Sequence, residues 1–468
     1  MSAVRVLLIS TYELGRQPFG LASPAAWLRA EGAEVSCLDL SQQELDPLAV
    51  RWAELIAFYL PMHTATRIAL SAIKKVRALN PEAQLCAYGL YAPLNAGLLR
   101  AAGVAAVFGG EFEPALAETV RSIAGNGRRI PPQDKPQVSL DRLQFRVPDR
   151  TGLPPLEKYA RLVMPDRSLR IVGYTEASRG CKHLCRHCPI VPVYKGKFRV
   201  VQPDIVLEDI RRQVAAGAEH ITFGDPDFFN GINHALDILR ALHRDFPQLS
   251  YDVTIKVEHL LQHAKHLPLL RDTGCAFVTT AVESLDDRVL SILDKSHTRA
   301  DFLRLVPLFR QAGLTLAPTF VAFTPWITPA GYADLLDTIS DLDLVENVSP
   351  VQLAIRLLIP AGSRLLELAE VSDIVGEFDP VALSYRWQHP DPGMDELQQD
   401  IERRVQTLTA GGHSRRSIFE DVRRLVGSRP GSAPAGHSIA QAPPVSLPAP
   451  PAMASRATVP YLTEPWYC

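Results

Sequence analysis

Three cysteines, Cys181, Cys185 and Cys188, lie within eight residues in the segment GCKHLCRHCP. The segment follows a predicted strand, so the C-x3-C-x2-C spacing gathers three thiolates on one loop. Structural zinc needs four ligands, and a complete iron–sulfur cube normally takes four cysteines. Three ligands leave one iron open to a substrate or cofactor, which favours an iron–sulfur cluster. Zinc stays an alternative, with His183 or His187 as the fourth ligand, although no second C-x2-C pair exists.

The composition places this loop in a globular protein of ordinary make-up. The chain has 468 residues, 47% of them hydrophobic and 21% charged, which predicts about two to four domains. Its formal net charge of −2 gives no bulk electrostatic reason to bind nucleic acid. We find no signal peptide and no membrane span, so we expect a cytoplasmic location, where thiols stay reduced. The seven cysteines, an odd number, argue against a disulfide framework.

Residues 1–125 alternate short apolar strands with helices. The stretches VRVLLIS, AEVSCLDL, ELIAFYL, AQLCAYG and VAAVFGG have strand character. Five strands joined by helices predict a parallel sheet covered on both faces, in a Rossmann-like (flavodoxin-like) α/β domain. Ligands of such domains bind at the carboxyl ends of the strands. The following residues, 126–165, are rich in Pro, Arg and Asp, and we expect them to form a linker.

Residues 166–365 repeat a pattern of helix, glycine and strand. Gly217, Gly274 and Gly313 each stand where the end of a helix favours a left-handed residue. The segment SPVQLAIRLLI is predicted to supply one of the later strands. About six strand–helix units predict a partial or full (β/α) barrel of the triosephosphate-isomerase type, whose site lies at the carboxyl ends of its strands.

The C-terminal part of the chain divides into three segments. Residues 366–427 are predicted to be mainly helical and charged. Residues 428–458 are rich in Pro, Ala and Ser, and we expect a disordered linker there. A short aromatic tail, VPYLTEPWYC at 459–468, follows it and ends on Cys468. A compact tail after such a linker is unusual, because chain ends generally lose order gradually.

The segment SRGCKHLCRHCP resembles the cluster loop of radical S-adenosylmethionine (SAM) enzymes. The resemblance implies a 4Fe–4S cluster on Cys181, Cys185 and Cys188, with SAM chelating the fourth iron through its amino and carboxylate groups. One electron from the cluster would cleave SAM to a 5′-deoxyadenosyl radical, which takes hydrogen from the substrate. His187 stands where the family usually has an aromatic residue.

Five further residues are candidates for binding SAM. Gly224 and Asp225 in ITFGDPDFFNG resemble the family segment that approaches the SAM amino group, although Gly-Asp-Pro is also good turn chemistry. Glu283 stands at a predicted strand end facing the barrel mouth, where a carboxylate could bind the ribose hydroxyls or the charged groups of SAM. Lys256 and Arg356 are charges inside strand patterns that could face the carboxylate of SAM or a substrate anion. Ordinary ion pairs are the alternative for these three charged residues.

A local basic patch surrounds the cysteine loop. It consists of Lys182, Arg186, Lys195, Lys197 and Arg199. The patch predicts docking of an acidic electron donor such as flavodoxin or ferredoxin, because electrostatic steering acts through local patches. A solvated loop is the alternative.

A Rossmann-like domain before a radical SAM barrel resembles the architecture of cobalamin-binding radical SAM proteins. The usual cobalamin motif with an axial histidine, D-x-H-x-x-G, is missing, since the chain reads STYELGRQPFG after its first strand. The first histidine is His63, after the third strand. Any cobalamin would therefore bind without a histidine from that motif. A domain without cofactor and a domain that binds substrate are the alternatives; the lack of G-x-G-x-x-G after the first strand disfavours a dinucleotide.

The end of the chain carries a second resemblance. YLTEPWYC, RWQHPDP and AIRLLIPAGSRLLEL resemble radical SAM (seleno)proteins with a Cys-Sec-Ala-Glu-Pro (CUAEP) or Cys-Cys-Ala-Glu-Pro (CCAEP) tail. Our hypothesis is that the reading frame is cut at a selenocysteine UGA directly after Cys468, which would make the chain a truncated selenoprotein. A Cys-Sec arm could reduce an intermediate or resolve a sulfur bond at the barrel mouth.

These observations together predict a radical SAM enzyme, with cobalamin-dependent methyl transfer as the leading reaction. One alternative is a cobalamin-independent radical SAM enzyme that uses the redox-active tail for sulfur or peptide chemistry. Another is a non-catalytic zinc or iron–sulfur binding module. Methylthiolation of transfer RNA is disfavoured, because the chain has no second three-cysteine set and no basic RNA-binding tail domain. The sequence names no substrate and no residue that acts on it.

Overall fold

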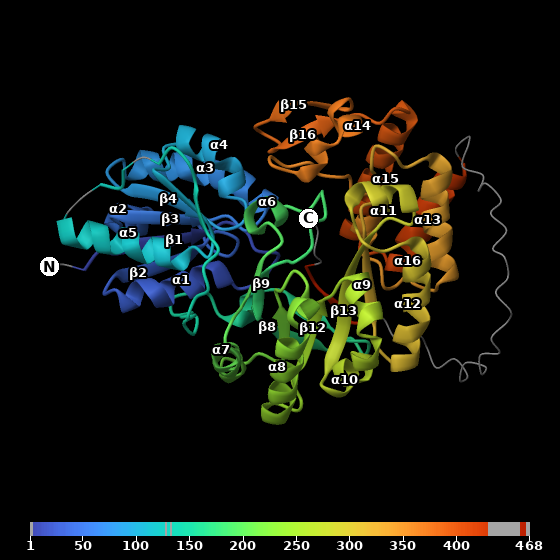
Figure 1. Cartoon of the computed structure of the whole chain (residues 1–468), viewed down its shortest axis with the longest axis horizontal. Helices are drawn as coiled ribbons and strands as arrows, with labels where there is room; N and C mark the ends of the chain where they lie inside the picture. The colour runs from blue at the N-terminus through green and yellow to red at the C-terminus, as the bar shows by residue number, and fades with distance from the viewer. Residues whose placement is uncertain (1–2, 127–128, 132, 429–458, 465–468) are drawn as a thin grey trace.

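The computed structural model describes residues 3–126, 129–131, 133–428 and 459–464. Two α/β units lie side by side, as Figure 1 shows, with the N-terminal unit in blue and the barrel unit in green to yellow. The orange C-terminal elements lie against the barrel. The predicted order of a parallel-sheet domain followed by a barrel is therefore confirmed.

The N-terminal unit is a parallel sheet in the order β2-β1-β3-β4-β5-β6. Alternate residues of β1 to β5 enter opposite cores, because successive side chains of a strand point to opposite faces. One core takes in α2, α3 and α4, and the other takes in α1 and α5. The strands are β1 Arg5–Ser10, β2 Glu34–Asp39, β3 Leu55–Tyr59, β4 Gln84–Tyr88, β5 Ala106–Gly110 and β6 Gln137–Ser139. The helices are α1 Phe19–Ala30, α2 Pro47–Trp52, α3 His63–Leu79, α4 Ala96–Ala101 and α5 Glu113–Asn126, with a 3-10 turn at Pro93–Asn95.

The strand order makes the fold flavodoxin-like. The chain leaves β1 toward one edge and β3 toward the other, and ligands of such sheets bind in the crevice at this switch point. The loops that follow β1, β3, β4 and β5 are therefore the expected ligand-binding side of the unit.

The predicted linker is more ordered than expected. Within residues 126–165, β6 joins the first sheet beside β5, and β7 Arg161–Val163 pairs antiparallel with β8. A 3-10 turn, Leu156–Lys158, lies between them. Both exposed sheet edges offer unpaired backbone groups, and the connecting chain pairs with them.

The barrel unit is a seven-stranded sheet in the order β14-β13-β12-β11-β8-β7-β17. Its first five strands are parallel and its last two antiparallel, so the barrel is partial. The predicted left-handed glycines are confirmed, with φ of +98° at Gly217, +95° at Gly274 and +67° at Gly313. The parallel strands are β8 Leu169–Thr175, β11 His220–Phe223, β12 Ser250–Thr254, β13 Cys275–Glu283 and β14 Leu316–Phe320. The helices are α7 Pro203–Ala215, α8 Ile232–Asp245, α9 Val257–Gln262, α10 Leu267–Asp272, α11 Asp287–Leu293, α12 Arg299–Ala312 and α13 Pro329–Asp341, with 3-10 turns at Phe228–Gly231 and Ala264–His266.

The strand predicted from SPVQLAIRLLI is wrong. A 3-10 turn, Pro350–Leu353, occupies its start, and only an isolated bridge joins Phe323 to Arg356. The Gln352 side chain accepts a hydrogen bond from the Phe320 N–H at 2.9 Å. A side chain thus satisfies the last amide of β14, where a sixth parallel strand would have used its backbone.

The C-terminal segment, predicted as helical, contains helices and a hairpin. The hairpin strands β15 Val375–Asp379 and β16 Ser384–Trp387 pair antiparallel. The helices α15 Pro392–Ala410 and α16 Arg415–Gly427 bury apolar residues in the barrel core, among them Leu397, Ile401 and Val422. A 3-10 turn at Arg364–Glu367 and the short helix α14 Ala369–Ser372 precede the hairpin.

The end of the chain returns to the barrel. β17, Tyr461–Leu462, pairs antiparallel with β7 as the edge strand of the sheet. The Thr463 N–H donates to the Arg161 carbonyl at 2.8 Å, and the Arg161 N–H donates to Thr463 Oγ1 at 2.9 Å. The predicted linker between Ser428 and Val459, and the terminal Cys468, lie outside the described residues.

Candidate cofactor site

The three cysteines lie on one loop after the short strand β9, Ser178–Gly180. The chain leaves through the short helix α6 Val191–Tyr194 and the strand β10 Phe198–Val200, which pairs antiparallel with β9 and closes the loop at its base. Cys181 and Cys185 are 9% and 6% exposed. Burial raises the pKa of the Cys181 thiol and raises that of Cys188 to about 12. Such buried thiols need a positive charge to ionise, which a bound metal centre supplies.

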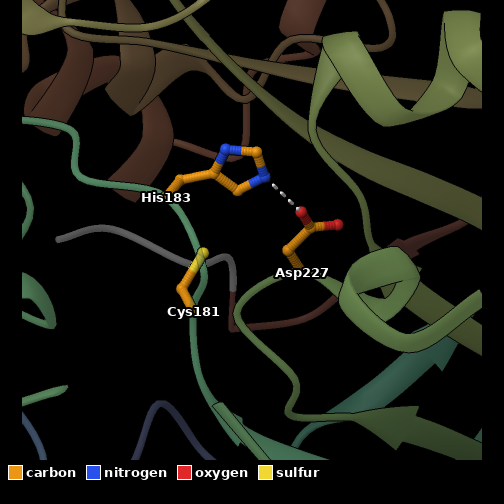
Figure 2. Close-up of side chains that lie close together, drawn as sticks. All are labelled: Cys181, His183 and Asp227. Atoms are coloured by element: carbon orange, nitrogen blue, oxygen red, sulfur yellow. Dashed lines mark ion pairs between the residues drawn. The ribbon is translucent and has the colours of Figure 1, made fainter. Parts of the chain in front are cut away.

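Two histidines lie between the cysteines, and each contacts at least one carboxylate. His183 Nε2 is 3.4 Å from Asp227 Oδ2, and His259 Nδ1 is 2.6 Å from the same oxygen. Figure 2 shows His183 and Asp227 facing each other above the Cys181 thiol. His187 Nε2 lies 3.2 Å from Glu283 Oε1.

Asp227 organises this corner of the site. Burial opposes ionisation of its carboxyl, but the nearby imidazoles of His183 and His259 outweigh burial and hold its pKa below the ordinary value. The donor atoms of Cys181, His183 and Asp227 lie within 4.8 Å of one another, close enough to hold a single metal ion. Such an ion would use only one of the three cysteines and would compete with the Asp227–His259 contact. The three thiols together fit a cluster with three protein ligands better.

Two buried lysines lie beside the thiols. Lys256 Nζ is 3.7 Å from Cys185 Sγ, and the residue is 6% exposed. Lys295 Nζ is 3.1 Å from Glu283 Oε1, and burial of the ammonium is outweighed by this carboxylate, so its pKa is raised. Lys256 was a predicted site residue, whereas Lys295 was not. Its segment, LDKSH, lies in a loop between helices, and no pattern in the sequence links it to the cysteines.

Glu283 ends β13 at the barrel mouth in a strained conformation. Its φ of +68° lies in the left-handed region, which a non-glycine residue adopts only when its surroundings hold it there. Burial would raise the pKa of its carboxyl, but Lys295 and His187 outweigh burial and lower it. The carboxylate is therefore ionised between two partners at the cavity wall.

Gly224 and Asp225 have different roles in the same turn. A Cβ on Gly224 would lie 1.7 Å from the Tyr174 hydroxyl, so the backbone approaches this side chain too closely for any other residue. Asp225 accepts hydrogen bonds from the Ala177 N–H at 2.9 Å and from Ser178 Oγ at 2.5 Å. Burial raises the pKa of its carboxyl to about 7. Asp225 thus fixes the strand that leads into the cysteine loop.

Arg356 forms an ordinary ion pair, which was the alternative to binding SAM or a substrate anion. Its guanidinium donates to Asp395 at 2.5 Å and to the Trp387 carbonyl at 2.7 Å, and it lies 3.5 Å from the centre of the Trp387 ring. The side chain therefore connects the barrel to the C-terminal hairpin and helix α15. We do not assign it to SAM.

One cavity of about 480 Å³ joins the two units. It extends from the loops after β1, β3, β4 and β5 of the first sheet to the barrel mouth, and the described tail contributes to its wall. Lining residues from the first unit include Leu14, Tyr59, Met62, Gly89, Gly110 and Phe112. Those from the barrel include the three cysteines, Gly224, Lys256 and Glu283, and those from the tail are Val459, Pro460, Tyr461 and Leu462.

The first unit lines this cavity without a histidine. His63 Nε2 contacts the Ala382 carbonyl at 2.5 Å and is not among the lining residues. The backbone comes close at Gly89, where a Cβ would lie 2.8 Å from the Leu60 carbonyl oxygen. No helix in the described part of the chain is long and apolar enough to cross a bilayer.

Residues 175–341 match the model of the Radical SAM superfamily. Hopanoid C-3 methylase of Methylococcus capsulatus is 24% identical over 335 residues, which cover 68% of this chain and 64% of that protein. A tRNA-2-methylthio-N(6)-dimethylallyladenosine synthase of Bacillus pumilus is 28% identical over 169 residues. That match covers 31% of this chain and only 30% of the synthase.

Two solved enzymes share the fold of both units. TsrM from Kitasatospora setae, a radical SAM methyltransferase with cobalamin and a [4Fe-4S] cluster bound, has a TM-score of 0.67 at 17% identity, over 91% of this chain and 100% of that chain. OxsB, a cobalamin-dependent SAM radical enzyme with aqua-cobalamin and SAM bound, has a TM-score of 0.69 at 13% identity. The match covers 91% of this chain and 72% of that chain. At these identities the likeness establishes a common fold. Because the superfamily match covers the segment with the three cysteines, residues 175–341 form a radical SAM domain.

Proposed function

We propose that the chain is a cobalamin-dependent radical SAM methyltransferase. The observation that carries the proposal is the single cavity between the ligand-binding side of a flavodoxin-like sheet and a loop of three buried cysteines. Cobalamin and SAM would have to share such a cavity for a methyl group to pass between them. The bound forms of TsrM and OxsB, which share the fold, support this assignment.

Cys181, Cys185 and Cys188 would hold a 4Fe–4S cluster, which supplies one electron for the reductive cleavage of SAM. Lys256 and Lys295 lie beside the thiols and would stabilise the negative charge of the cluster sulfurs. Both lysines are buried, so little water screens this interaction.

We assign SAM to the part of the cavity lined by Gly224, Lys256 and Glu283. Gly224 and Glu283 both line this part of the cavity, and the Glu283 carboxylate is ionised beside Lys295 and His187. Asp225 contributes by holding the turn rather than by contact. Leu14, Tyr59, Met62 and Phe112 give the first unit an apolar face toward the cavity, suited to a large planar cofactor bound without a histidine ligand.

A second candidate is a cobalamin-independent radical SAM enzyme that uses its tail for sulfur or peptide chemistry. The observation that favours it is the position of residues 459–462 in the cavity wall, six or more residues before Cys468. The two candidates predict different cofactor content.

The test is anaerobic reconstitution with iron and sulfide, addition of hydroxocobalamin, desalting, and measurement of iron, cobalt and the absorbance spectrum. About four irons and one cobalt per chain would support the proposal. Iron without cobalt would overturn it in favour of the second candidate, and zinc without iron would overturn both. A triple variant, Cys181→Ala, Cys185→Ala and Cys188→Ala, is the control: it should lose iron and keep cobalt.

A further inference from the structure

Arg179 is a buried cation at the boundary between the two units. It lies on β9, two residues before Cys181, and is 6% exposed. Its guanidinium reaches Glu113 at 2.7 and 3.0 Å, Glu111 at 3.3 Å and Glu176 at 2.7 Å. Glu111 and Glu113 belong to the first unit and are fully buried.

The partners of Arg179 connect two loops of the cavity. Glu111 and Glu113 follow β5, where the neighbouring Gly110 and Phe112 line the cavity from the first unit. On the other side, β9 continues directly into the cysteine loop. Tyr194, on the helix after the cysteines, donates its hydroxyl to Glu111 at 3.3 Å. The Glu111 carboxylate therefore contacts residues on both sides of the cysteine loop, and Glu113 adds a second contact to Arg179.

The Arg179 guanidinium is surrounded by aromatic rings, so its charge depends on the buried carboxylates. The Phe145, Phe112 and Phe19 rings have their centres 5.1, 5.2 and 5.8 Å from the Arg179 Cζ. Paired charges in such an apolar setting lose much when one partner is removed, because the other stays buried and uncompensated. Bidentate contact with Glu113 also fixes orientation, which a lysine ammonium reproduces only in part.

We propose that Arg179 is a positioning residue that locks the β5–α5 loop of the first unit against the cysteine loop of the barrel. It would thereby set the separation between the cobalamin face and the SAM face of the cavity. The part that concerns cobalamin rests on the proposed function. The locking of the cysteine loop itself does not.

The experiment compares wild type with Arg179→Met and Arg179→Lys, each as the full chain. The matched control is Arg299→Met, which removes a guanidinium that binds Asp334 and Thr338 on the outer helices. One readout is the rate at which iodoacetamide alkylates Cys181, Cys185 and Cys188 in the metal-free protein, followed by mass spectrometry. The other is the affinity for hydroxocobalamin from absorbance titration.

We expect Arg179→Met to speed alkylation and to weaken hydroxocobalamin binding, each by about tenfold, with Arg179→Lys between it and wild type. Arg299→Met should lower thermal stability and change neither readout. Unchanged alkylation in a folded Arg179→Met variant would overturn the proposal. If that variant does not fold, Glu113→Gln, which keeps the shape of the side chain, takes its place with the same expectation. Failure of wild type to bind hydroxocobalamin would overturn the proposed function, while the alkylation rates would still decide the role of Arg179.

Discussion

The Lys295 ammonium lies 3.1 Å from the Glu283 carboxylate, and both groups are buried at the wall of the cavity beside the cysteines. Lys295 comes from the loop between α11 and α12, and Glu283 ends β13. The pair therefore joins the end of β13 to the α11–α12 loop. Glu283, the residue with φ +68°, is one of its two members.

Lys295→Met is expected to destabilise the protein by about 3–5 kcal/mol, because it leaves the buried Glu283 carboxylate with His187 as its remaining partner. Glu283→Gln removes the charge and keeps the shape, so the loss should be smaller. Urea unfolding of the metal-free protein measures both. If Glu283 binds SAM, Glu283→Gln also weakens SAM binding to the reconstituted protein, whereas unaltered SAM affinity would leave the residue with a structural role alone.

The residues that were predicted belong to short sequence patterns, whereas the residues that were missed depend on contacts between distant segments. The cysteine loop and the glycines after helices could be predicted because their function depends on a few consecutive residues. Lys295 and Arg179 could not, because their partners are brought to them by the packing of loops and units far apart in the chain. Arg356 was visible as a charge in an apolar stretch, but only the packing of α15 provides Asp395, which determines its partner.

The same distinction applies to the fold. The two α/β units follow from alternating apolar strands and helices. The ends of the sheets do not, because residues 137–139 and 161–163 become strands only by pairing with an available edge. Near Phe320, the expected sixth strand is absent from the described sheet, and the Gln352 side chain bonds the Phe320 N–H instead.

The Glu111 carboxyl provides a prediction about pH. Burial raises its pKa from 4.5 to about 7; Glu113 and Glu176 add to this, and Arg179 and the Tyr194 hydroxyl oppose it. A group whose pKa is raised on folding binds more protons in the native state between these two values, so stability is lost as pH rises from about 4.5 to 7.

Glu111→Gln removes this titration. The free energy of unfolding of the variant, relative to that of wild type, should therefore increase by at most about 3 kcal/mol between pH 4.5 and 7, since one pKa unit corresponds to about 1.4 kcal/mol. Above about pH 7 the difference should stay constant. Urea unfolding of metal-free wild type and variant at pH 5 and pH 8 tests it. A pH-independent difference between the two proteins would contradict the raised pKa.

The basic patch divides into structural and exposed members. Arg186 donates to the Ser291 and Ile292 carbonyls, and Arg199 donates to the Leu140 and Phe198 carbonyls. The remaining members are exposed, and they are Lys182, Lys195 and Lys197. The turn at Gly196 brings the last two close to the first, since a Cβ there would lie 3.5 Å from the Lys182 carbonyl oxygen.

If an acidic electron donor docks on these lysines, Lys195→Glu with Lys197→Glu should slow cluster reduction by reduced flavodoxin about tenfold or more at low salt. The effect should shrink as ionic strength rises. Stopped-flow absorbance measures the rate, and reduction by dithionite should be unchanged. Lys74→Glu with Lys75→Glu, on α3 of the other unit, is the control with the same change in charge. An equal rate in all variants would remove the docking hypothesis.

The described tail provides the last prediction, because its contacts are few and specific. Leu462 packs beside the buried Leu162 and Phe277, and Tyr461 lies under the Arg415 guanidinium, 4.5 Å from ring centre to Cζ. Glu464 accepts a hydrogen bond from the Tyr12 hydroxyl at 2.5 Å, so the tail also contacts the first unit. A chain that ends at Thr458 loses all of these contacts, whereas one that ends at Glu464 keeps them and lacks only the final four residues.

We expect the chain ending at Thr458 to be less stable than wild type and to exchange the Arg161 amide at least about tenfold faster, because this amide loses its bond to Thr463. The chain ending at Glu464 should match wild type in both. Leu462→Asp should reproduce the shorter truncation without changing chain length, because an ionised side chain cannot pack beside Leu162. Hydrogen exchange by mass spectrometry and urea unfolding provide the measurements. Equal protection of β7 in all four proteins would mean that β17 does not stay paired in solution.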